Sequence, residues 1–304
     1  MKNRSPALFG LVAGALLLAA CGSGPGTKTT GAKVVASFYP FAFVAEQVGG
    51  TNVSVANLTS PGVEPHDLEL KPRQVGALQD ADLVIYEHNF QAAVDDAIGQ
   101  SGRDNKDTID VAKLLKLQPL PASEGDARDH AEDDPHVWLD PANMIVITEV
   151  VRAKLSAVDP DHASSYTKNA NLFIAKLKAL DASFSTGLAK CASTKIVTSH
   201  AAFGYLAKRY GLEQVPIAGL DPSNEPSLAQ LAVITNLVRK DKITTIFTEE
   251  LVSPAVAKTV AGATGAKTAT LDPIEGLSNE TAHENYLTLM AKNLSVIEKA
   301  NNCS

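Results

Sequence analysis

Cysteine, aromatic residues and positive charge are all scarce in this sequence. Its 304 residues include 3 cysteines and 1 tryptophan, and aromatic residues make up 5% of the chain. Acidic residues outnumber basic ones by 34 to 27, which gives a net charge of −7. Nucleic-acid binding depends on clustered Lys and Arg that neutralise phosphates, so this balance argues against a nucleic-acid partner. With 45% apolar residues, the chain can still bury a sizeable core, which excludes wholesale disorder.

Long hydrophobic runs are also missing beyond the N-terminus. Residues 7–20 are apolar and follow a short basic stretch, but they are too few to span a membrane comfortably. The run ends in Leu-Ala-Ala-Cys21, which resembles the bacterial lipobox. We therefore expect a lipoprotein signal peptide at 1–20, a lipid anchor on Cys21 and a flexible Gly/Ser/Thr-rich tether at 21–32. An ordinary secretory signal with an incidental cysteine is the alternative.

The two remaining cysteines are consistent with export. Cys191 and Cys303 form an even pair, and cysteine pairs outside the cytoplasm are commonly oxidised. We expect a disulfide that ties down the C-terminus, with two unpaired buried thiols as the alternative.

A repeat divides the chain into two halves. Residues 35–49 match residues 197–211 at a constant offset of 162. The coinciding pairs are Val35/Val197, Ser37/Ser199, Phe41/Phe203, Ala45/Ala207 and Gly49/Gly211. Each copy is typical of a strand followed by a helix that ends at glycine, and each half holds a later strand, at 81–86 and 243–248. The pattern predicts an α/β fold with a mostly parallel sheet in each half.

A helical connection is predicted between the halves. Asp140-Pro141 and Asp159-Pro160 both have the capping residue and proline that open helices. The second helix is expected between Pro160 and about Lys190; about 28 residues of helix at 1.5 Å each give roughly 42 Å, long enough to bridge two lobes. We expect an N-terminal lobe at 33–140, the connection at 141–189 and a C-terminal lobe at 190–304.

Three of the seven histidines stand where strands are expected to end. His66 precedes a predicted helix, His136 precedes another, and His200 follows the strand at 195–199. Open α/β sheets place ligand sites at the carboxyl ends of their strands, so these side chains can converge. Neutral imidazole is a common ligand of Zn²⁺, although no short zinc motif such as HExxH is present.

Several ordered blocks resemble one known family. They are Pro65–Pro72 (PHDLELKP), Asp134–Pro141 (DPHVWLDP), Ser199–Gly211 (SHAAFGYLAKRYG), Asn224–Ser227 (NEPS) and Thr270–Leu277 (TLDPIEGL). Together with the lipobox they resemble the zinc branch of the metal-binding receptor lipoproteins of bacterial ABC importers, which are ZnuA/TroA-like. The resemblance implies a metal site in the cleft between the lobes, with His66, His136, His200 and Asp272 as ligands. Manganese-selective members place Glu where His200 stands, so the imidazole here indicates zinc.

Other residues are candidates for supporting roles. Glu64 lies two residues before His66, and Glu249 follows the strand at 243–248, so both are possible partners of the ligands rather than ligands themselves. His88 is expected in the cleft wall or on the surface. Zinc receptors of this type often carry a long His-rich acidic loop, whereas the loop at 124–134 is short, with six acids and one histidine.

The resemblance implies a receptor that captures Zn²⁺ outside the cytoplasm and delivers it to an ABC importer permease. The expected protein is a monomer, lipid-anchored at the cell surface or in the periplasm, and not an enzyme. A manganese receptor is the alternative within the same class. A zinc hydrolase would keep an open coordination position, and a surface adhesin has no support from the low aromatic content.

The first prediction concerns the N-terminus of the exported protein. Because the apolar segment ends in Leu-Ala-Ala-Cys21, the mature chain is expected to begin at Cys21 and to carry lipid there. Mass spectrometry of the mature N-terminus measures this. A chain that begins at residue 22 or later, or that retains the signal peptide, contradicts the prediction.

Overall fold

A computed structural model describes residues 31–103, 106–119 and 133–304. Residues 31–304 form one compact unit. Cys21 and most of the acidic loop at 124–134 lie outside the described residues. None of the described helices has both the length and the hydrophobicity needed to cross a membrane.

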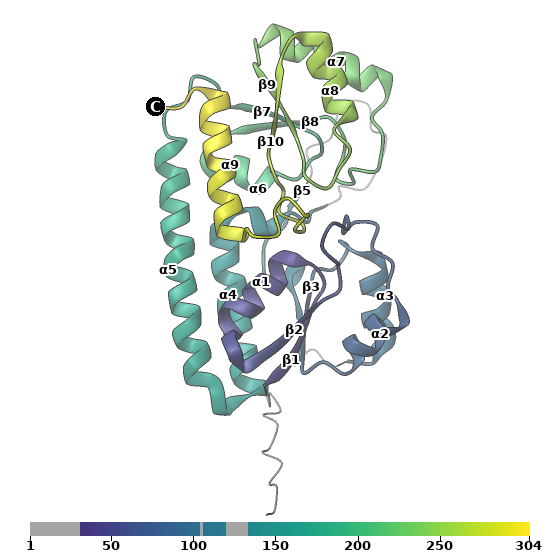
Figure 1. Ribbon diagram of the computed structural model, residues 1–304, viewed down its shortest axis with the longest axis vertical. Coiled ribbons are helices and arrows are strands. Elements are labelled where there is room, and N and C mark those ends of the chain that lie inside the picture. The colour runs from purple at the N-terminus through teal and green to yellow at the C-terminus, as the bar shows by residue number, and fades with distance from the viewer. Residues whose placement is uncertain (1–30, 104–105, 120–132) are drawn as a thin grey trace, which may run out of the picture. The chain divides into compact units, whose positions relative to one another are not determined.

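Two separate four-stranded parallel sheets confirm the predicted fold class (Figure 1). The first has strands β1 (Ala32–Ala36), β2 (Val53–Asn57), β3 (Leu83–Tyr86) and β4 (Thr108–Asp110), and the second has β7 (Lys195–Thr198), β8 (Glu213–Pro216), β9 (Thr245–Thr248) and β10 (Lys267–Thr270). Their orders are β2-β1-β3-β4 and β8-β7-β9-β10, so both sheets are built in the same way. The repeat seen in the sequence therefore corresponds to a repeated topology.

Helices cover both faces of each sheet. In the first half they are α1 (Tyr39–Gly49), α2 (Pro72–Gln79), α3 (Ala92–Ser101) and α4 (Pro141–Val158); in the second they are α6 (Gly204–Tyr210), α7 (Leu228–Lys240), α8 (Ala255–Thr264) and α9 (Tyr286–Asn301). Along β1, Val34 and Ala36 pack into the large core shared with α1 and α4, whereas Val35 packs into the core under α2 and α3. This alternation with both faces apolar is characteristic of covered parallel strands.

The two predicted helix starts in the connection had different outcomes. Asp140 accepts a hydrogen bond from the Ala142 backbone N–H at 2.8 Å and opens α4 at Pro141, as predicted. After Pro160 the chain first makes a 3₁₀ turn (Pro160–His162), and the long helix α5 is Ala163–Gly187. The Asp159 carboxylate bonds the His162 and Tyr166 side chains instead of capping the helix backbone. The helix is therefore shorter than predicted, at roughly 37 Å for its 25 residues.

Helix α5 lies against elements of both halves. It packs on α1 and α4 from the first half and on α9 from the second, through one continuous hydrophobic core (Figure 1). The short strands β5 (Gln118–Pro119) and β6 (Asp133–Asp134) pair antiparallel; β5 precedes the acidic loop, and β6 is formed by its last two residues. Three short 3₁₀ segments complete the described elements: Gly50–Asn52, Val111–Lys113 and Val137–Leu139.

The predicted disulfide between Cys191 and Cys303 is present. It joins residues 112 positions apart and fastens the chain after α9 to the segment before β7. A crosslink that closes a loop of this length restricts the unfolded chain strongly and thereby raises the free energy of unfolding.

The second prediction follows from this crosslink. Replacing both cysteines by serine is expected to lower the free energy of unfolding by about 2–4 kcal/mol, because the unfolded chain regains the freedom of a long loop. Denaturant unfolding without metal measures the difference. Each single variant, Cys191→Ser or Cys303→Ser, should lose as much as the double variant, since either one breaks the bond. A double variant as stable as the oxidised protein contradicts the prediction.

Candidate metal centre

Four loops bring three histidines and one glutamate together. His66 lies between β2 and α2, and His136 directly precedes the 3₁₀ turn that leads into α4. From the second half, His200 follows β7 and Glu275 follows β10. These four residues form the one group, among the described residues, whose potential ligand atoms all lie within 4.8 Å of one another. The predicted convergence of the three histidines is thus seen in the structure.

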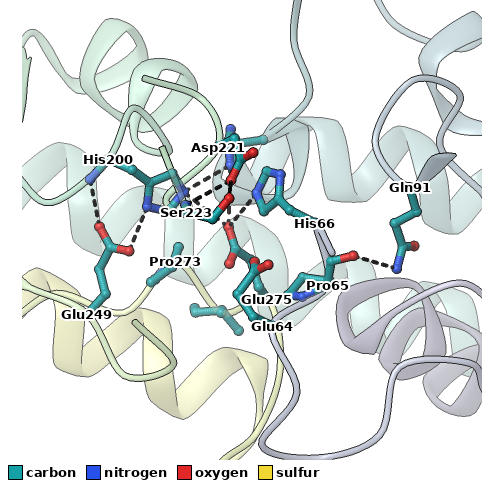
Figure 2. A network of polar contacts seen from close by, with 12 residues as sticks. Glu64, Pro65, His66, Gln91, His200, Asp221, Ser223, Glu249, Pro273 and Glu275 are labelled. Carbon is teal, nitrogen blue, oxygen red and sulfur yellow. Dashed lines mark hydrogen bonds and ion pairs between the residues drawn. The ribbon is translucent and has the colours of Figure 1, made fainter. Parts of the chain in front are cut away.

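The separations inside the cluster are those of a small coordination polyhedron. Glu275 Oε1 lies 3.3 Å from Nε2 of His136, 3.3 Å from Nε2 of His200 and 3.6 Å from Nε2 of His66. Figure 2 shows Glu275 with His66 and His200. The two Nε2 atoms of His136 and His200 are 3.3 Å apart. The edges of a tetrahedron with bonds of 2.0–2.1 Å measure about 3.3–3.4 Å, which these separations match closely.

Most of the cluster is buried, and some of its polar atoms have no hydrogen-bond partner among the described residues. His136 and His200 have no exposed surface, and Glu275 is 1% exposed. His66 Nε2 and both carboxylate oxygens of Glu275 are buried without a hydrogen-bond partner among the described residues. Buried polar atoms without partners are costly, so a group that binds all of them at once would be strongly favoured. A metal cation at the centre is such a group.

Two of the imidazole rings are hydrogen-bonded to carboxylates through Nδ1, the nitrogen on the side away from Glu275. Asp134 Oδ1 accepts from the Nδ1 of His136 at 2.8 Å and from the backbone N–H of the same residue at 2.9 Å. Glu249 also bonds both the ring and the backbone of its histidine: Oε2 lies 2.6 Å from Nδ1 of His200, and Oε1 accepts from the His200 backbone N–H at 3.0 Å (Figure 2). A carboxylate on Nδ1 keeps the proton on that nitrogen and directs the lone pair of Nε2 toward the cluster.

The electrostatics of the cluster are dominated by these carboxylates. Burial lowers the pKa of His200, but the charge and hydrogen bond of Glu249 outweigh it and hold the pKa well above its usual value. The pKa of His136 is raised, because Asp134 and Glu275 outweigh the opposing effect of burial. For Glu275, burial raises the pKa, but contact with three imidazoles brings it well below the ordinary value. The carboxylates therefore favour the charged form of His136 and His200, and the imidazoles favour the charged form of Glu275.

The fourth position differs from the sequence prediction. Asp272 was expected there, but the structure puts Glu275 beside the histidines instead. Asp272 Oδ1 accepts from the backbone N–H of Ile274 at 2.7 Å, so its carboxylate is turned toward its own loop. Burial raises the pKa of Asp272 to about 7. Between the two acids, Ile274 has a backbone φ of +57°, and it is the side chain of Glu275 that lies in the cluster.

Glu64, His88 and a further histidine, His162, all lie outside the cluster. Glu64 Oε2 is 3.3 Å from the backbone N of Asp67, while its Oε1 is buried, and burial raises the pKa of this carboxyl group. His88 is half exposed and pairs with Asp95, away from the cluster, as one of its two alternatives expected. His162 pairs with Asp159 at the start of α5.

Asp134 and Glu275 were missed in the sequence. Asp134 lies two residues before His136, the same spacing that drew attention to Glu64, so this signal was available. Glu275 stands in the same family block as Asp272, at 270–277, but nothing in a linear sequence distinguishes the two carboxylates.

Three imidazoles and one carboxylate, from loops of both halves of an α/β chain, form a candidate metal centre whose donors suit a borderline cation. The chain belongs to the ZnuA family, described as "Zinc-uptake complex component A periplasmic", which matches residues 34–300. This result confirms the family resemblance inferred from the sequence blocks.

Curated relatives extend over nearly the whole chain. The zinc-binding lipoprotein AdcA of Streptococcus pneumoniae is 39% identical over 310 residues, which cover 98% of this chain and 61% of AdcA. The chain thus spans about three fifths of that relative. The high-affinity zinc uptake system protein ZnuA of Bacillus subtilis is 36% identical over 317 residues, with 98% of each protein covered.

Solved structures agree with the fold. The Zn(II)-bound ZnuA-like domain of S. pneumoniae AdcA matches with a TM-score of 0.76 and 38% identity, covering 90% of this chain and 99% of that one. The laminin-binding protein Lmb of Streptococcus agalactiae, a bifunctional protein with adhesin and metal transporting activity, matches with a TM-score of 0.78 and 33% identity, covering 89% and 99%.

The third prediction concerns the carboxylate behind His200. Glu249→Gln keeps the size of the side chain but removes its charge, so His200 becomes a weaker donor, and metal affinity is expected to fall about 10–100-fold. Competition with a chelator of known affinity measures this. Asp95→Asn is the matched control, since Asp95 pairs with the half-exposed His88 outside the cluster. Equal effects of the two substitutions would contradict the role given to Glu249.

Proposed function

We propose that this protein is an extracytoplasmic receptor that binds Zn²⁺ as cargo and delivers it to an ABC-type importer. One observation carries the proposal: four buried donor atoms, from His66, His136, His200 and Glu275, with separations of 3.3–3.6 Å that are those of a tetrahedral zinc site. In this proposal Glu275 replaces Asp272 as the fourth ligand.

The donor set favours Zn²⁺ over Mn²⁺. Manganese prefers oxygen donors and higher coordination numbers, whereas three imidazoles with one carboxylate suit a tetrahedral borderline cation. The relatives named as zinc-binding or zinc-uptake proteins support the same choice. A manganese receptor is the competing proposal within the family, and a direct comparison of the two ions separates them.

The cluster suits a carrier better than a catalyst. Catalytic zinc keeps one position open for water, but here four protein donors close the tetrahedron. The site is also composed of residues from both halves of one chain, which is consistent with a monomeric receptor. Exchange of the cargo would need the loops of the two halves to separate, since the donor atoms themselves are buried.

The names of the relatives support the proposed location and partner of the receptor. Relatives named as lipoproteins and as uptake-system components support export, anchoring through Cys21 and a membrane permease that accepts the ion. Lmb is also described as an adhesin, but the chemistry of the cluster bears only on metal binding.

The fourth prediction tests the metal and the site together. His200→Glu replaces a borderline nitrogen by a hard oxygen that can bind through two atoms, so Zn²⁺ affinity should fall while Mn²⁺ competes better. Affinities for both ions are measured by competition. His162→Glu is the control for added charge, because His162 lies at the start of α5 and pairs with Asp159. If both variants change the Zn²⁺/Mn²⁺ preference equally, His200 is not a ligand and the proposed site is wrong.

A further inference from the structure

The loop that carries Glu275 has an unusual backbone. Ile274, directly before Glu275, has φ of +57° and its side chain is 0% exposed. Positive φ brings Cβ too close to the backbone, and for a β-branched residue it is a genuine outlier. The other described non-glycine residues with positive φ are Asn89, Lys242 and Asn302, none of which is β-branched. Such strain persists only where surrounding contacts impose it.

Asp272 supplies one of those contacts. Its Oδ1 accepts from the backbone N–H of Ile274 at 2.7 Å, and this bond is buried. Its Oδ2 has no hydrogen-bond partner among the described residues, so the interaction with Ile274 accounts for the orientation of the carboxylate. Asp272 thus bonds the residue whose conformation is strained.

Two hydrogen bonds with a residue of α9 hold the backbone of Asp272 in place. Asn293 accepts from the Asp272 backbone N–H at 2.9 Å and donates its Nδ2 to the Asp272 carbonyl at 2.6 Å. Next along the loop, Trp138 donates its Nε1–H to the Pro273 carbonyl at 2.7 Å. Asp272, Pro273 and Ile274, the three residues directly before Glu275, each take part in at least one buried hydrogen bond.

We propose that Asp272 is a positioning residue for metal binding: through its bond to Ile274 it holds the left-handed turn that points Glu275 at the three histidines. This inference rests on the proposed function, since it assigns Asp272 an effect on the metal that is transmitted through Glu275. Asp272 then affects Zn²⁺ binding without touching the ion. The effect comes from the oxygen that accepts the Ile274 N–H and does not depend on the charge of the carboxylate.

The first experiment separates the acceptor from the charge. Asp272→Ala removes the bond to Ile274 and is expected to lower Zn²⁺ affinity about tenfold or more, as loss of a ligand's supporting partner does. Asp272→Asn removes the charge but keeps an oxygen that accepts from the Ile274 N–H, so it should restore affinity to within about twofold of the unmodified protein. Chelator competition gives both values. An Asn variant as weak as the Ala variant overturns the proposal.

The second experiment asks whether Asp272 acts through Glu275. In a Glu275→Gln background, adding Asp272→Ala should weaken Zn²⁺ binding no further, because the group that it positions no longer acts as a charged ligand. An equal loss in both backgrounds overturns the positioning role and leaves the proposed function intact. If Glu275→Gln alone leaves Zn²⁺ affinity unchanged, the proposed ligand set fails, and the positioning proposal fails with it.

A third pair of variants keeps the proposal testable if Asp272→Ala does not fold. Ile274→Ala and Ile274→Gly both remove the buried side chain, but only glycine adopts positive φ without steric cost. The Gly variant should therefore bind Zn²⁺ several-fold more tightly than the Ala variant. Equal affinities would mean that the turn at residue 274 does not control Glu275, and would overturn the proposal.

Discussion

The rest of the structure depends on one close contact, in which a single carboxylate oxygen lies beside three imidazole nitrogens. Glu275 Oε1 comes within 3.3–3.6 Å of Nε2 of His66, His136 and His200, although the four residues come from four different loops. The loops with His66, His200 and Glu275 follow strands of the two parallel sheets, whereas His136 lies between β6 and α4; two of the four residues belong to each half of the chain. Open α/β sheets place ligand sites at the carboxyl ends of their strands, and three of the four donors come from such strand ends.

The structure then has to keep these donors in place without metal. Asp134 and Glu249 fix two of the rings, and the large core continues from one half to the other under α5. Trp138 is the central link: its Nε1–H bonds the Pro273 carbonyl, its own carbonyl accepts from Tyr286 at 2.6 Å, and its ring lies against His136. A buried polar network with satisfied members specifies one arrangement, which preorganises a site for a small cation.

Much of the fold could be predicted from the sequence because its signals are local. The repeat at offset 162 and the apolar strands predicted two parallel sheets, and Asp140-Pro141 predicted the start of α4. The start of α5 was misjudged because Asp159 bonds side chains rather than the helix backbone. In the site, the histidines were found through strand ends and family blocks. The sequence did not reveal that Glu275, rather than Asp272, is the carboxylate in the cluster. That choice depends on the backbone conformation at Ile274, which no residue pattern predicts.

The central claim is that zinc is held by three imidazole nitrogens and one carboxylate oxygen of this chain. X-ray absorption at the zinc edge, on the zinc-loaded protein in solution, tests it most directly. The account predicts four nitrogen or oxygen neighbours at about 2.0–2.1 Å, with the outer scattering of imidazole rings. Five or six light neighbours, or a first shell without imidazole scattering, would contradict it.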